Sequence, residues 1–224
     1  MPAPGARFAD LPTEFSVFPL AGALLLPHTR LPLNIFEPRY LALVEDALGH
    51  GRLFGMIQPD PSHPDGPNGP ALFAVGCLGR LIAFSETDDN RFLITLAGLI
   101  RFRVLAELPP ERGYRLVHAN FSSFAADLAP TPPTSGIARA PLLTALRAYL
   151  TARGLGADWK ALDSMPEERL VGALSTLCPF APTEKQALLE APDEPARGET
   201  LLALLRLNAY TRPGDTAEKA PLAS

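Results

Sequence analysis

Short apolar runs, broken by proline, glycine and asparagine, open the chain. The runs EFSVFPL, ALLLP and LPLNIF occupy residues 14–20, 23–27 and 31–36. Their length and punctuation are typical of short β-strands. Residues 59–70 (PDPSHPDGPNGP) contain five prolines and two glycines, a composition that predicts a loop.

The spacing of apolar residues changes between the third run and this loop. Leu41, Val44 and Leu48 recur at the interval of one helix face. Proline is favoured in the first turn of a helix, and glycine is favoured just beyond its end. The pattern therefore predicts a single helix that begins at Pro38 and ends at Gly49.

The pattern over residues 72–121 predicts a β-meander. The runs FAVGCLGRLIAF (73–84) and RFLITLAGLIRFRV (91–104) flank SETDDN, a turn-rich stretch of the kind that joins two strands of a hairpin. Several short strands at this spacing favour a closed or nearly closed barrel, which removes exposed strand edges.

Strict alternation marks the start of the second long run. Phe92, Ile94 and Leu96 fall on one face of the predicted strand. Gly98 interrupts the alternation and predicts a bulge or a sharp bend.

The second half of the chain has helical character. It follows residues 125–136 (AADLAPTPPTSG), whose composition is typical of a linker. Ser164 with Glu167, and Thr183 with Gln186, have the three-residue spacing of a capping box at a helix start.

These patterns together predict an α+β protein in two parts. We expect a β-barrel subdomain over residues 10–121, a linker over 122–136, a helical bundle over 137–210 and a disordered tail over 211–224. One helix is expected to cross the barrel.

Charge is nearly balanced along the chain. The 20 Lys and Arg against 24 Asp and Glu leave a net charge of -4. That balance provides no general attraction to nucleic acid or to an anionic membrane, so a nucleic-acid partner is not expected. Arg101 and Arg103 flank Phe102, and alternation predicts that both arginines are exposed.

Cys77 and Cys178 are the only cysteines, and each lies in an apolar stretch. Two such residues predict buried thiols in a reducing compartment and no disulfide framework. The first residues lack a signal-peptide pattern, and no apolar run approaches the roughly 20 residues of a membrane span. We expect a soluble, cytoplasmic protein without a membrane partner.

Motifs of catalysis and of metal binding do not occur in the sequence. It has no Walker A phosphate loop and no G-x-S-x-G elbow. The histidines are scattered, without H-E-x-x-H or a nearby cysteine pair, so no metal or cofactor is expected. They are His28, His50, His63 and His118. We expect no enzyme, although a nucleophile assembled from distant residues is an open alternative.

Polar and aromatic residues meet where the third apolar run passes into the predicted helix. Phe36, Glu37, Arg39 and Tyr40 are the candidate binding residues, because aromatic rings beside a charged pair can form a recognition rim. The alternative interpretation is an ion pair that only fixes the junction.

The same segment carries a family resemblance. Phe18-Pro19, Leu25-Leu26-Pro27 and residues 36–40 (FEPRY) resemble the opening of the N-terminal substrate-recognition domain of Lon-type ATP-dependent proteases. Residues 75–79 (VGCLG), 97–104 (AGLIRFRV) and 182–190 (PTEKQALLE) resemble later blocks of that domain, so the resemblance covers about residues 14–208.

The resemblance implies a PUA-like β-barrel followed by a helical bundle. It also implies non-catalytic recognition of unfolded or apolar polypeptide segments, as an adaptor or a holding protein, with a protease or chaperone as a further partner. Lon itself continues into an ATPase and a Ser-Lys protease, which this sequence lacks, so degradation is not implied. The family supplies no catalytic residues. PUA-like barrels also serve small molecules and RNA, and this is the alternative binding function.

Overall fold

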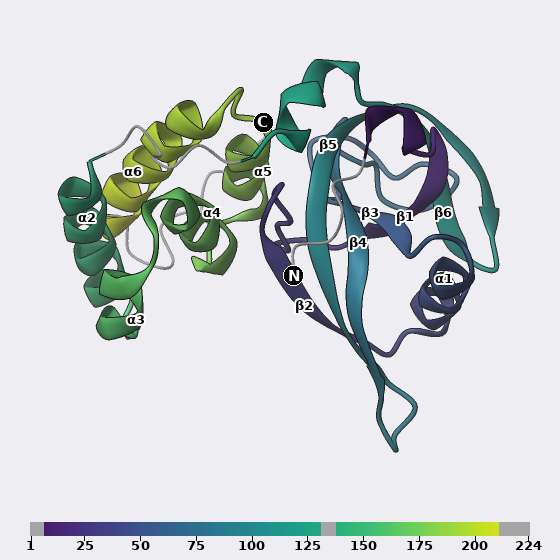
Figure 1. Cartoon of the computed structure of the whole chain (residues 1–224), viewed down its shortest axis with the longest axis horizontal. Coiled ribbons are helices and arrows are strands. Elements are labelled where there is room, and N and C mark those ends of the chain that lie inside the picture. Colours follow the sequence, from purple (N-terminus) through teal and green to yellow (C-terminus); the bar gives the residue numbers. More distant parts are fainter. Residues whose placement is uncertain (1–6, 131–137, 211–224) are drawn as a thin grey trace, which may run out of the picture. The chain divides into compact units, whose positions relative to one another are not determined.

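The computed structural model describes residues 7–130 and 138–210, which form two compact units (Figure 1). Within the described residues, the first unit combines 7–130 with 172–190, and the second combines 138–171 with 191–210. Helices and strands are both present, which confirms the predicted α+β class.

A six-stranded sheet forms most of the first unit. Its strands are β1 (Glu14–Pro19), β2 (Arg30–Ile35), β3 (Leu53–Ile57), β4 (Val75–Glu86), β5 (Phe92–Glu111) and β6 (Tyr114–Asn120). The strand order is β2-β5-β4-β3-β1-β6, and β5 also pairs with β6. Pairing therefore forms a closed circuit of five strands, while β2 lies outside it beside β5.

The long strand β5 makes this closure possible because it changes partners along its length. Its first part pairs with β2, from Phe92 to Ala97, and its last part pairs with β6, from Arg103 to Glu111. The register against β4 shifts between Leu78 and Gly79, next to Gly98, which confirms the predicted irregularity. A β-carbon at Gly98 would lie 2.0 Å from the carbonyl oxygen of Leu26, so only glycine fits there.

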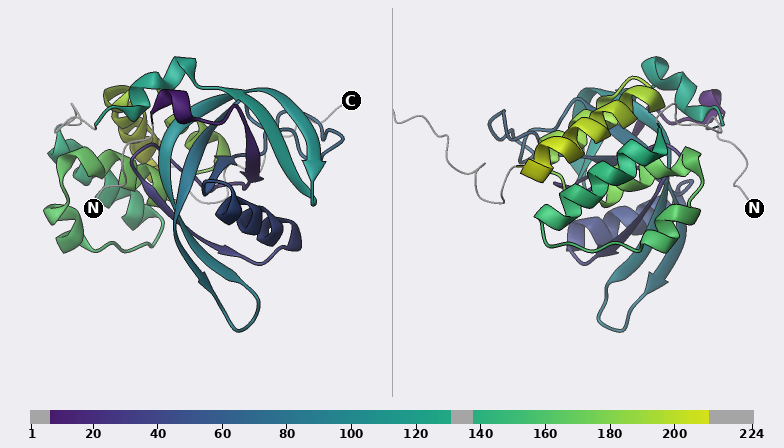
Figure 2. Two further views of the ribbon diagram at one scale, coloured as in Figure 1. Left: turned by 45° about the vertical axis from the view of Figure 1, so that its right-hand side comes forward. Right: turned by 90° about the vertical axis from the view of Figure 1, so that its left-hand side faces the viewer.

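The predicted helix is confirmed as α1, Pro38–Gly49. Pro38 occupies the first turn, and Gly51 just beyond the end has a φ of 76°. Tyr40, Leu43 and Val44 form part of its buried face. Figure 2 (left) shows α1 alongside the closed sheet, with the β4–β5 hairpin extending beyond the other strands.

A buried hydrogen-bond network attaches helix α5 (Pro182–Glu190) to the sheet of its own unit. The Gln186 amide donates to the carbonyl oxygen of Val75 at 3.0 Å. The Gln58 amide donates to Gln186 Oε1 at 3.2 Å and to the carbonyl oxygen of Pro182 at 3.0 Å. Lys185 Nζ donates to the carbonyl oxygen of Gly22 at 2.7 Å.

This network corrects the capping box predicted at Thr183 and Gln186. The Glu184 carboxylate accepts the N–H of Ala181 at 2.8 Å, so one half of a capping box forms two residues earlier than predicted. Gln186 is buried and bonded to the sheet instead. The other predicted cap is also wrong, since Ser164 ends helix α3 and donates to the carbonyl oxygen of Ala161.

The exposure predicted for Arg101 is also wrong, because the residue is only 3% exposed. The shifted register near Gly98 leaves Ile100, Arg101 and Phe102 all buried. The guanidinium makes two bonds of 2.8 Å to the carboxylate of Asp127, which offsets the cost of burying its charge. Arg103 is exposed as predicted.

Asp127 lies in a short 3-10 helix, η2 (Ser122–Leu128), which covers the first part of the predicted linker. A second 3-10 helix, η1 (Phe8–Asp10), precedes β1. Residues 131–136 of the predicted linker, residue 137 of the predicted bundle and the predicted tail, 211–224, lie outside the described residues.

The second unit is helical. It contains α2 (Arg139–Ala152), α3 (Trp159–Ser164), the beginning of α4 (Glu167–Leu177) and α6 (Glu194–Tyr210). Helices α2 and α6 run side by side (Figure 2, right). Leucines at helical spacing fill the space between them, and the Arg153 guanidinium donates to Asn208 Oδ1 at 2.7 Å.

Candidate functional site

The four candidate residues come together where β2 passes into α1. Glu37 is the N-cap of α1, and its side chain makes no capping bond. It instead accepts hydrogen bonds from Arg39 Nη2 at 2.8 Å and from Arg39 Nε at 3.1 Å. Both side chains are about half exposed, so this ion pair contributes little to stability.

Tyr40 lies beneath this pair and not on the surface. It is 5% exposed, and its ring centroid is 4.0 Å from that of Phe18. Burial raises the pKa of its phenol, and the charge of Arg39 acts in the opposite direction. Because the Arg39 guanidinium carbon lies 4.6 Å from the ring centroid, Tyr40 supports the position of Arg39.

Phe36 is the candidate residue that is most available to a ligand, with 60% of its surface exposed. Its ring faces the guanidinium of Arg91, whose carbon lies 5.6 Å from the ring centroid. Arg91 stands directly before β5 and also pairs with Asp89 at 2.7 Å.

Sequence reasoning missed the hairpin residues beside Phe36. Leu93 is 47% exposed, and it pairs with Asn34 of β2 and Ser85 of β4. Successive side chains of a strand point to opposite faces, so Leu93 and Arg91 share the outer face of β5. Alternation alone could not place Leu93 beside Phe36, because that position depends on the pairing of β2 with β5. We name Phe36, Arg91 and Leu93 the outer-face cluster.

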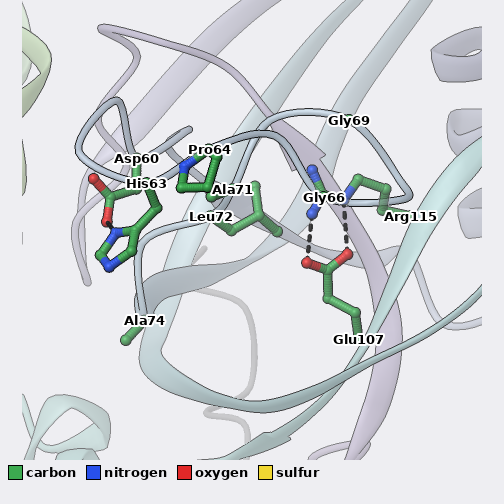
Figure 3. A pocket seen from close by; sticks show the side chains of 10 residues that line it. All are labelled: Asp60, His63, Pro64, Gly66, Gly69, Ala71, Leu72, Ala74, Glu107 and Arg115. Atoms are coloured by element: carbon green, nitrogen blue, oxygen red, sulfur yellow. Dashed lines mark hydrogen bonds and ion pairs between the residues drawn. The ribbon is translucent and has the colours of Figure 1, made fainter.

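A pocket of about 410 Å³ lies elsewhere in the first unit, under the loop that joins β3 to β4 (Figure 3). Asp60 and His63 form one end, and Arg115 with Glu107 forms the other. The Arg115 guanidinium donates to Glu107 Oε2 at 3.0 Å and to the carbonyl oxygen of Pro70 at 2.6 Å. These groups are paired with one another, and we interpret them as holding the loop in place.

Asp60, Ser62 and His63 combine the residue types of a hydrolytic triad but not its geometry. Ser62 Oγ lies 3.2 Å from His63 Nδ1, and Asp60 Oδ2 lies 2.7 Å from the same nitrogen. A triad uses opposite ring nitrogens for these two contacts. The hydrogen bonds from Ser62 are the main cause of the lowered pKa of Asp60. This cluster therefore provides no support for the hydrolase alternative.

Residues 7–130 and 138–210 contain neither a metal-binding cluster nor a helix that could span a membrane. No group of three or more His, Cys, Asp or Glu side chains is placed to hold a metal ion. Within the same part of the chain, every helix is too short or too polar to cross a membrane.

Most of the curated relatives match a little under half of the chain. "Lon protease 2" of Sorangium cellulosum is 36% identical over 104 residues, which cover 45% of this chain and 13% of the relative. "Lon protease 1" of Thermus thermophilus is 26% identical over 202 residues, which cover 86% of this chain and 24% of the relative. The chain thus spans about an eighth of the length of the Sorangium relative.

Solved structures match along most of the chain. A Lon N-terminal domain protein from Xanthomonas campestris has a TM-score of 0.57 and 26% identity, covering 85% of this chain and 98% of that one. The N-terminal domain of a Lon protease from the Mycobacterium avium complex has the same TM-score at 13% identity, covering 86% and 97%, and shows a likeness in fold. The family model described as the substrate-binding domain of the ATP-dependent protease La (Lon) matches residues 14–206. The chain therefore belongs to the family of Lon substrate-binding domains.

Proposed function

We propose that this protein binds non-native polypeptide segments without catalysing a reaction on them, and that it acts as an adaptor or a holding protein. The family supports the ligand class, because its members are described as substrate-binding domains of a protease. A protease or a chaperone that receives the bound polypeptide is the further partner in this proposal.

The observation that carries the proposal is the outer-face cluster. Phe36 and Leu93 expose apolar surface beside the cationic Arg91. Aromatic residues and arginine dominate the energetics of protein interfaces, and the two apolar side chains here lie together beside an arginine instead of singly. Glu37 and Arg39 provide a polar rim near Phe36.

The charge of the hairpin favours polypeptide over RNA. Glu86, Asp88 and Asp89 stand in the turn region next to Arg91. A phosphate backbone would be repelled by these carboxylates, and its binding would weaken steeply with salt. We expect polypeptide binding here to change by less than about twofold between 50 and 300 mM salt, because apolar burial carries it.

Binding of a permanently unfolded protein tests the proposal. We expect labelled, reduced and carboxymethylated α-lactalbumin to bind at roughly micromolar affinity in fluorescence anisotropy. Phe36→Ser and Leu93→Ser should each weaken binding about fivefold or more, with the melting temperature unchanged. Leu207→Ser is the matched control, since Leu207 is 64% exposed but lies in the second unit.

Two results would contradict the proposal. One is a wild-type protein that leaves the unfolded probe free while retaining RNA in a salt-sensitive manner. The other is hydrolysis of ATP or casein that survives repurification and scales with the protein concentration.

A further inference from the structure

Strand β2 ends the sheet on one side. It pairs with β5 from Arg30↔Ala97 to Ile35↔Phe92, and the described residues place no second strand beside it. An unpaired edge presents a row of main-chain N–H and C=O groups that can pair with another extended chain.

The ladder shows which main-chain groups of β2 point outward. The Gly98 N–H donates to the carbonyl oxygen of Thr29 at 2.9 Å, so the next pair along the antiparallel ladder, Arg30 with Ala97, is a non-hydrogen-bonded pair. Hydrogen-bonded pairs alternate with non-bonded pairs along such a ladder. Bonds to β5 therefore fall at Leu31, Leu33 and Ile35, and the main-chain groups of the residues between them point away.

The outward residues are Arg30, Pro32 and Asn34, and all three are exposed. Among the hydrogen bonds within the described residues, none satisfies the outward N–H or C=O of Arg30 or Asn34. Pro32 fits this assignment. Proline has no N–H, so at an outward position it removes no hydrogen bond between β2 and β5.

We propose that an extended segment of a bound polypeptide adds to β2 as an antiparallel strand. This inference rests on the proposed function, since it specifies how a polypeptide ligand is held. Such a strand would exchange two hydrogen bonds with Arg30 and two with Asn34, and would donate one to the carbonyl oxygen of Pro32.

The outward donors and acceptors of β2 favour an extended polypeptide as the ligand. The outward groups of Arg30 and Asn34 are four residues apart, or roughly 14 Å along a strand. An extended backbone supplies alternating donors and acceptors at that spacing, whereas a phosphate backbone offers acceptors alone. Main-chain pairing gives affinity that is independent of sequence, which suits a receptor of varied unfolded chains.

Phe36 adds a preference for apolar side chains to this pairing. It directly follows Ile35 at the end of β2 and is exposed. A side chain of the added strand near Asn34 would lie next to the Phe36 ring. The missing N–H of Pro32 limits the strength of the edge, which reduces pairing between two copies of this chain.

Two substitutions with opposite expected effects test the edge, using the carboxymethylated α-lactalbumin probe. Asn34→Pro removes an outward N–H that β5 does not use, so binding should weaken at least fivefold. Asn34→Val changes the same side chain but keeps the N–H, and it should bind like the wild type. Pro32→Val supplies the missing N–H and should tighten binding about threefold or more.

Hydrogen exchange provides an independent measurement. Adding the probe should slow exchange of the Arg30 and Asn34 amides, while the Leu31 and Leu33 amides, already bonded to β5, should change little.

Failure of this inference can be told apart from failure of the proposed function. If the wild type binds the probe but Asn34→Pro matches Asn34→Val and Pro32→Val gives no gain, the edge assignment is wrong and polypeptide binding stands. If the wild type does not bind, both are overturned. A wild-type dimer in solution that Asn34→Pro abolishes would assign the edge to a second copy and also overturn the inference.

Discussion

At the scale of single residues, the buried thiol of Cys178 makes the stability of the fold dependent on alkaline pH. Burial raises the pKa of this thiol to about 12 from an ordinary value of 9.0, and the nearby Lys185 ammonium acts in the opposite direction. Above pH 9 the unfolded chain ionises the thiol while the folded chain keeps it protonated. The folded state then binds more protons, so its stability falls as the pH rises.

We expect this thiol to reduce the free energy of unfolding by about 2 kcal/mol at pH 10.5, relative to pH 8. Urea titrations at the two pH values measure the change. Cys178→Ala should show a loss smaller by about that amount, since the other titrating groups, including Lys185, whose pKa burial lowers, are retained. Equal losses in the two proteins would show that the thiol is not responsible.

Residue-level prediction from the sequence succeeded where alternation holds and failed where it is interrupted. Phe92, Ile94 and Leu96, which were predicted to share one face, are all buried. The role of Phe36 in binding stays a prediction. Arg101 was wrongly predicted to be exposed, because the alternation was extended through Gly98. Its burial depends on a register shift and on Asp127, 26 positions away. No local pattern encodes either. Tyr40 is similar, since its packing against Phe18 requires the fold.

At the scale of elements, α5 is attached by the buried amide of Gln186. Replacing it with alanine leaves the Val75 carbonyl oxygen and the Gln58 amide without this partner. Unsatisfied buried polar groups cost about 1–3 kcal/mol each, so Gln186→Ala should lower the free energy of unfolding by about 2–4 kcal/mol in urea titration.

Thr183→Ala is the control for this prediction. The capping box predicted from sequence would make Thr183 and Gln186 equally important to the helix start. The network instead predicts that Thr183→Ala stays within about 0.5 kcal/mol of the wild type, as surface substitutions usually do. Similar losses for the two variants would restore the capping interpretation.

Elements with a strong period were predictable, and their long-range pairing was not. Helix α1 and the β4–β5 hairpin follow from helical spacing and from a turn-rich hexamer. The exposed edge of β2 did not follow, because an apolar run carries no information about which neighbour it lacks. The same holds for Leu93, whose place beside Phe36 depends on how β2 and β5 pair.

At the scale of the whole molecule, the two units do not follow the order of the chain. Residues 172–190 return to the unit formed by 7–130, so the chain passes between units three times. The subdomain boundaries expected from composition, 10–121 and 137–210, stay a prediction that limited proteolysis can test. A composition shift can suggest a linker but cannot indicate that a later helix packs against an earlier sheet.

Limited proteolysis should cut first within residues 59–70 or 129–136. After a cut in the second range, the two pieces should elute together from a sizing column without denaturant, because α5 of the later piece is bonded to the sheet of the earlier one. The same sample of Gln186→Ala should separate more readily. Early cleavage inside residues 92–104 would show that the sheet is assigned wrongly.

The late position of α5 in the sequence delays completion of the first unit during synthesis. The sheet is complete in sequence at Asn120, but α5 begins only at Pro182. Ribosomes add roughly 5–20 residues per second, so about 3–12 seconds separate the two during synthesis. Through that interval the Val75 carbonyl oxygen and the Gln58 amide must be hydrated. We therefore expect the nascent sheet to be an intermediate that becomes fully stable only after most of the helical unit has been made.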